Sequence, residues 1–169
     1  MGAHGDITLP AQTAFGIAVK PFDKLTIEAD AIFTQWSSFD ELKIEFDDNI
    51  LKGTPLPPVT SSSKAKDWRN TWRLSLGVEY NATDWLDLRA GYSWDQSPLQ
   101  DYTMDALIPA HDRHIFNLGA GLHMDDWRVD LAYTYLMAND MEGHTVDDIP
   151  VKYENADAHM FAVSVGYEF

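Results

Sequence analysis

The chain of 169 residues contains no cysteine, so it can form neither a disulfide framework nor a cysteine-based zinc site. It is also poor in basic residues, with 12 Lys and Arg against 27 Asp and Glu and a formal net charge of −15. Nucleic-acid binding is therefore excluded, because it needs clustered positive charge. Residues 1–6 lack the basic and apolar regions of a signal peptide. No apolar run reaches the roughly 20 residues of a transmembrane helix.

What the chain does have is a repeated alternation of apolar and polar side chains. Successive side chains of a β-strand point to opposite faces, so each alternating segment predicts a strand with one apolar and one polar face. In the segment 72–80, for example, Trp72, Leu74 and Leu76 alternate with Arg73 and Ser75. Strict alternation occurs in the segments 72–80, 86–94, 127–135 and 161–169. Three less regular segments are Thr13–Lys20, Leu25–Thr34 (with a stretch up to Phe46 that fits as its extension) and His114–Met124. The pattern predicts seven strands and no helix.

The connections between these strands alternate in length. Short turns are expected at Pro21–Lys24, Asn81–Asp84 and Met124–Asp126, and long loops at Asp47–Arg69, Gln96–Asp112 and Asn139–Ala156. Short turns at one end and long loops at the other are typical of outer-membrane barrels, in which the short turns are periplasmic.

Aromatic residues are expected at both ends of the strands, as in the two girdles of a membrane barrel. The girdle at the short-turn end would contain Tyr80, Trp85, Trp127, Tyr167 and Phe169, and the outer one Trp68, Trp72, Trp94 and Tyr102.

A soluble β-sandwich or lipocalin-like barrel would also show alternating strands. Three features favour the membrane barrel instead. The apolar face is rich in bulky rings, the opposite face is rich in Gly, Ala and Ser, and the aromatics lie toward the strand ends. The terminal Phe169 closes an alternating strand and resembles the C-terminal signal by which the barrel-assembly machinery recognises outer-membrane proteins.

Seven strands are an odd number, whereas bacterial single-chain barrels have an even number and both termini in the periplasm. Tracing back from a periplasmic Phe169 places the start of the chain outside the cell. Edge strands left unpaired in lipid would cost several kcal/mol per backbone group. We therefore expect residues 1–169 to be one C-terminal barrel segment, with earlier strands missing; the alternative is a strand that the pattern does not reveal.

Several strings occur in the order seen in the long-chain fatty acid outer-membrane transporter family (FadL/TodX). The run Ile108-Pro-Ala-His-Asp-Arg-His114 resembles the I-P-x-x-D-R segment of that family. Further strings similar to the family are Ile7-Thr-Leu-Pro-Ala11, Phe15-Gly-Ile-Ala-Val-Lys-Pro21, Trp36-Ser-Ser-Phe39, Asp67-Trp-Arg-Asn-Thr-Trp-Arg73, Arg89-Ala-Gly-Tyr92 and Asp95-Gln-Ser-Pro98.

This resemblance implies a monomeric barrel of fourteen strands, of which the chain supplies the last seven. It also implies uptake of hydrophobic molecules, such as fatty acids or aromatic hydrocarbons, past an N-terminal hatch. The hatch is absent from these residues. The expected partners are the hydrophobic ligand, outer-membrane lipids and lipopolysaccharide, and no cofactor is expected.

Three cations of the inward face or its loops are candidates for contact with a ligand headgroup: Arg73, Arg89 and Arg113. A guanidinium would bind a fatty acid carboxylate through charge-assisted hydrogen bonds. The competing interpretation is that these arginines pair with carboxylates on neighbouring strands and stiffen the wall.

Other chemistry finds less support in the sequence. His111 and His114 lack a third metal ligand at a reliable spacing, so no metal site is predicted. No nucleophile signature such as Gly-x-Ser-x-Gly occurs, so an enzyme is not expected. Two alternative functions stay open at this point: a small complete outer-membrane barrel with a structural or adhesive role, and a soluble β-barrel that binds lipid.

Overall fold

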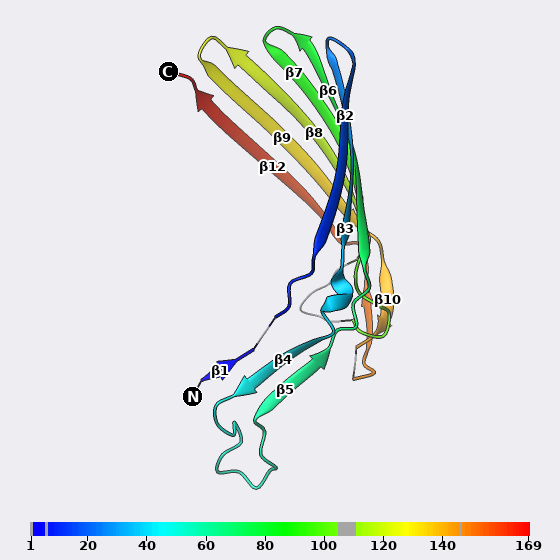
Figure 1. Ribbon diagram of the computed structural model, residues 1–169, viewed down its shortest axis with the longest axis vertical. Coiled ribbons are helices and arrows are strands. Elements are labelled where there is room, and N and C mark those ends of the chain that lie inside the picture. The colour runs from blue at the N-terminus through cyan, green and yellow to red at the C-terminus, as the bar shows by residue number, and fades with distance from the viewer. Residues whose placement is uncertain (1, 6, 105–110, 146) are drawn as a thin grey trace.

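The computed structural model describes residues 2–5, 7–104, 111–145 and 147–169, and its main element is a seven-stranded antiparallel sheet. The order across the sheet is β12-β9-β8-β7-β6-β3-β2 (Figure 1). The strands are β2 (Gln12–Phe22), β3 (Leu25–Thr34), β6 (Thr71–Thr83), β7 (Leu86–Asp95), β8 (Arg113–Met124), β9 (Trp127–Ala138) and β12 (Asp157–Tyr167). Each corresponds to one of the seven predicted segments, so the strand pattern is confirmed.

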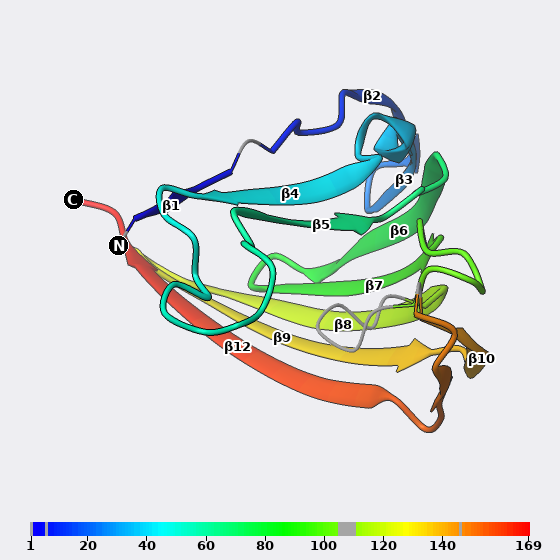
Figure 2. The ribbon, with the colours of Figure 1, turned by 90° about the horizontal axis from the view of Figure 1, so that it is seen from below.

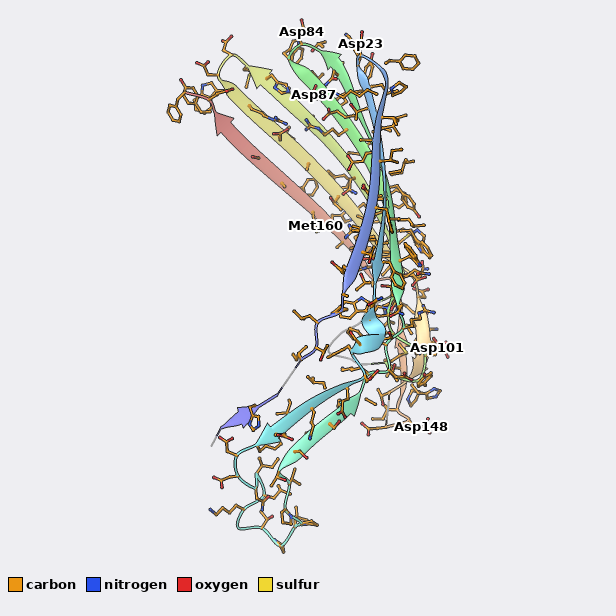
Figure 3. The ribbon with its side chains drawn as sticks, in the orientation of Figure 1. Asp23, Asp84, Asp87, Asp101, Asp148 and Met160 are labelled. Atoms are coloured by element: carbon orange, nitrogen blue, oxygen red, sulfur yellow. The ribbon has the colours of Figure 1, made fainter. Side chains whose placement is uncertain are left out.

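The two ends of the sheet differ as the connection lengths predicted. Tight turns join β2 to β3, β6 to β7 and β8 to β9 at one end, and the long loops lie at the other (Figure 1). Figure 3 labels Asp23 and Asp84 at the short-turn end and Asp101 and Asp148 at the loop end. In the turn after β8, Asp125 has a φ of 50°, a left-handed conformation that an Asp side chain tolerates.

The loop end contains structure that the sequence did not predict. It consists of β1 (Ala3–His4), β4 (Glu41–Phe46), β5 (Ser61–Ala65), β10 (Met141–His144), β11 (Pro150–Tyr153) and a 3-10 helix at Trp36–Ser38. β4 pairs with β1 and β5, and β10 pairs with β11. Among the described residues, no helix is long and apolar enough to cross a membrane.

The expected extension of the second strand to Phe46 is wrong. β3 ends at Thr34 and the chain then turns through the 3-10 helix, where the Ser37 amide donates to the Asn70 side chain at 2.9 Å. The residues that follow form β4, which belongs to a separate sheet. The polar contact and the packing of Trp36 on Trp68 hold this bend in place.

Viewed from the loop end, the main sheet bends through an arc from β2 to β12 (Figure 2). These two strands are its edges, each paired on one side only among the described residues. Both begin at the loop end, so the first and last strands of the sheet run in the same direction.

The register places the apolar side chains of neighbouring strands on one face and the polar and small ones on the other. On the polar face, Arg89 of β7 reaches Asp130 of β9 across the intervening β8, which fits the inside of a bend where side chains converge. The apolar side chains of the opposite face are exposed, Phe161 by 79%. A soluble barrel would bury these side chains, so the arrangement favours a lipid-facing wall.

The large buried apolar side chains among the described residues lie in the loops, not in the sheet. They are Trp68, Leu99 and Met104. The expectation that Trp68 belongs to the outer girdle is therefore wrong, because Trp36 and Phe39 pack edge-on against its ring, each at a centroid distance of 4.9 Å. At the short-turn end, Trp85, Trp127, Tyr80 and Tyr167 are exposed, as expected for a girdle.

Candidate functional site: the inward wall and the outer-loop cap

The polar face of the main sheet, which we call the inward wall, has Arg89 at the centre of an ion-pair network. Its Nε donates to Glu79 at 2.7 Å and its Nη1 donates to Asp130 at 2.8 Å, while Nη2 lies 3.5 Å from Asp87. Three carboxylates on three strands thus share one guanidinium. Arg128 adds a second cation, with its Nε 2.9 Å from Asp130.

Two glycines of β8 make room for this network. A Cβ on Gly121 would lie 3.1 Å from the guanidinium nitrogens of Arg89, and one on Gly119 would lie 3.4 Å from the Arg89 Cβ. The long Arg89 side chain therefore crosses β8 at two positions that have no side chain. Packing against Arg89 therefore explains two of the glycines on the inward face.

Asp87 is the most enclosed carboxylate of the wall and lies toward the short turns (Figure 3). It accepts a hydrogen bond from the Asn81 amide at 2.6 Å, and His123 Nε2 lies 2.7 Å from its other oxygen. Together with Arg89, these contacts satisfy both oxygens of Asp87. The short-turn end of the wall is thus held by a closed polar network.

The three predicted cations have different surroundings. Arg89 is committed to the network, and Arg113 pairs with Asp95, directly opposite it on β7, at 2.5 Å. Arg73 is exposed on the inward face, and no described residue forms an ion pair or hydrogen bond with it. The Asp95 that lies opposite Arg73 on β7 is already engaged by Arg113. Of the three, Arg73 is the one whose charge the wall leaves available.

Between Arg73 and the short-turn end, the inward wall contains an open hollow. A cavity of about 350 Å³ is lined by Glu28, Asp30, Gly77, Gly91 and neighbouring polar side chains. Gly77 and Gly91 are directly paired, and a Cβ on Gly77 would meet no atom within 4 Å. Unlike Gly119 and Gly121, this pair accommodates no long side chain of the described wall.

The long loops form a second unit, which we call the outer-loop cap: residues 65–70, 96–104 and 111–112 and the β10–β11 hairpin. Arg69 donates its backbone amide to Pro98 and its Nε to the Ser97 carbonyl at 3.0 Å. The Tyr102 hydroxyl donates to Asp67 at 2.5 Å, and this bond raises the pKa of Tyr102. Leu99 and Met104 are buried within the cap.

The β10–β11 hairpin closes against residues 101–104 through backbone contacts. The His144 amide donates to the Asp101 carbonyl at 2.7 Å, and the Met104 amide donates to the His144 carbonyl at 3.1 Å. Gly143 permits this approach, because a Cβ there would overlap the Asp101 carbonyl oxygen. The sequence did not predict the cap, because its contacts join loops that are distant along the chain.

His111 and His114, the pair considered for a metal, lie on different surfaces. His111 is buried in the cap, where its ring meets Tyr153 edge-on at 5.1 Å. His114 lies on the apolar face, with its Nδ1 2.7 Å from the Tyr92 hydroxyl. They do not form a joint ligand set, and the described residues contain no cluster of three metal-binding side chains.

Comparison with known proteins identifies the family of the chain. The family model described as outer membrane protein transport protein (OMPP1/FadL/TodX) matches residues 1–169. The chain belongs to this family. Of the strings that first suggested it, residues 108–110 lie outside the described residues.

The relatives within the family are outer-membrane proteins. An outer membrane protein of Neisseria meningitidis serogroup B is 34% identical over 148 residues, covering 85% of this chain and 31% of that protein. Outer membrane protein P1 of Haemophilus influenzae is 27% identical, covering 99% of this chain and 38% of P1. The long-chain fatty acid transport protein of Escherichia coli K12 is 24% identical, covering 81% and 28%. The chain therefore spans about a third of the length of these relatives.

Solved structures agree with the family. A Pseudomonas aeruginosa FadL homologue superposes with a TM-score of 0.79 at 28% identity, over 94% of this chain and 35% of that one. The toluene transporter TbuX of Ralstonia pickettii, at 16% identity and a TM-score of 0.57, supports the fold alone. This member of the FadL/TodX family is thus part of an outer-membrane β-barrel, and its family consists of transporters rather than enzymes.

Proposed function

We propose that the chain is the C-terminal half of a monomeric fourteen-stranded barrel that takes up hydrophobic molecules bearing an acidic headgroup, such as long-chain fatty acids. Two observations support the barrel proposal. The chain covers about a third of its relatives, and its sheet has two edges that run in the same direction. Closing seven strands on themselves would join these edges in parallel, unlike the antiparallel ladders of bacterial barrels.

The proposal of a ligand with an acidic headgroup is based on Arg73. It lies at the loop end of the inward wall without a described partner, whereas Arg89 and Arg113 are neutralised by carboxylates. A carboxylate entering from the cap meets Arg73 before it meets Glu28 and Asp30, which lie deeper on β3. The hollow over Gly77 and Gly91 then offers space for a polar plug segment.

Uptake by whole cells tests this proposal. The intact protein, expressed in a bacterium that lacks its own fatty acid transporter, is expected to restore accumulation of radiolabelled oleate. Radiolabelled toluene serves as the second substrate. Restoration with toluene alone would reassign the ligand to aromatic hydrocarbons, and restoration with neither would contradict the uptake function.

We also propose partners for the outward face of the sheet and for the terminal residue. The exposed apolar side chains contact outer-membrane lipid and lipopolysaccharide, and Phe169, which extends beyond β12, contacts the barrel-assembly machinery. Deleting Phe169 from the intact protein is expected to lower the folded amount in the outer membrane several-fold, measured by heat-modifiable mobility. Replacing Phe169 with tyrosine instead, which keeps the aromatic ring, should have little effect; equal losses would contradict the assembly role.

A further inference from the structure

His111 is a buried polar side chain that nothing in the proposed uptake function uses. It is 4% exposed, and neither ring nitrogen has a hydrogen-bond partner in the part of the chain that the structure describes. It lines a cavity of about 190 Å³ between residues 97–101 and the start of β10. Burial of a histidine without a closely bound partner favours its neutral form, because burying an uncompensated charge is costly.

The charged groups around His111 come from each loop of the cap. Asp112 is its chain neighbour, Asp140 precedes β10, and Arg69 and Asp101 line the same cavity. Loss of hydration lowers the pKa of His111 below its usual 6.5, and this effect outweighs the opposing contributions of the Asn139 carbonyl and the Asp140 and Asp112 carboxylates. Tyr153, on β11, presents its ring rather than a countercharge.

The position of His111 links it to the closure of the cap. Its ring packs against β11, while β10 of the same hairpin holds residues 101–104 through the His144 backbone. At its base, the Asn139 amide donates to the Asp112 carbonyl at 2.8 Å. Displacing the His111 ring therefore disturbs the packing that holds the hairpin against the inner loops.

We propose that His111 is a pH-operated latch: the neutral ring holds the β10–β11 hairpin in the closed cap, and protonation releases it. The role of this release in ligand entry rests on the proposed function, but the latch itself does not. The released state binds the proton more readily than the closed state, so closure is fully favoured above about pH 6.5 and weakens as the pH falls below it. One proton changes the ratio of open to closed cap by at most about tenfold per pH unit.

Hydrogen exchange in the intact protein tests the latch without any ligand. After correction for intrinsic exchange, the amides of residues 141–145 and 147–153 are expected to exchange several-fold faster at pH 5.5 than at pH 7.5. H111Q, which stays neutral, should remove this pH response, whereas H144Q should keep it, because the His144 side chain is exposed. G143V should exchange fast at both pH values, because its side chain cannot fit beside Asp101.

Three results would overturn the latch: an H111Q variant that responds to pH like its parent, a parent without a response, or slow exchange in G143V. Failure of oleate and toluene uptake would leave these exchange results unchanged. The latch and the transport function can therefore fail separately.

Discussion

Replacing Arg89 with methionine is expected to lower the free energy of unfolding by about 2 kcal/mol or more. Breaking a buried ion pair typically costs 3–5 kcal/mol, and we expect somewhat less because Arg89 retains 31% side-chain exposure. Glu79 would lose its cationic partner, and Asp130 would keep only Arg128. The measurement is a urea titration of the intact protein refolded in detergent micelles.

Arg128→Met is the matched control. Its guanidinium pairs with Asp130 on the same strand and is more than half exposed, so its loss should cost less than about 1 kcal/mol. A second variant, Gly121→Leu, disrupts the same network, because the new side chain displaces the Arg89 side chain. Similar small losses for all three variants would show that the network does not stabilise the wall.

Replacing Arg73 with glutamine is expected to weaken fatty acid binding by about tenfold to a hundredfold, because hydrogen bonds to charged groups contribute about 1.5–3 kcal/mol. Stability should not change, since no described residue depends on this side chain. Binding of oleate to the purified intact protein, measured by calorimetry, gives the affinity. Arg73→Lys should retain part of it.

The methyl ester of the same fatty acid provides the decisive comparison. It keeps the hydrocarbon chain but lacks the negative charge, so Arg73→Gln should bind it as well as the parent does. Arg128→Gln, which alters a cation that already has a partner, should bind both ligands normally. An equal loss of acid and ester binding in the Arg73 variant would exclude a headgroup contact.

The strands were predictable because a single local property, the two-residue period, determines them. The predicted segment 161–169 overlaps most of β12, although the strand begins earlier, at Asp157, because it pairs with β9 as far as Met137. Two ion pairs also follow from local register, since Glu79 lies directly opposite Arg89 and Asp95 lies directly opposite Arg113. The alternation alone could therefore suggest that arginines and carboxylates pair across strands.

The remaining contacts depend on relations that periodicity does not contain. Arg89 reaches Asp130 only because the sheet bends and Gly119 and Gly121 leave space between them. The sequence predicts Trp68 at the lipid boundary, but its surroundings depend on how the bend at Trp36–Phe39 meets the segment that contains Trp68. His111 likewise becomes distinctive only when the hairpin covers it.

The shared direction of β2 and β12 also restricts how this segment could be duplicated to enlarge a barrel. A tandem duplication would place the end of one copy on the opposite side of the bilayer from the start of the next. The linker would have to traverse the membrane, and the only segment that can do so within a sheet is one more strand. Enlarging a barrel by copying this block therefore adds eight strands rather than seven, which keeps the total even.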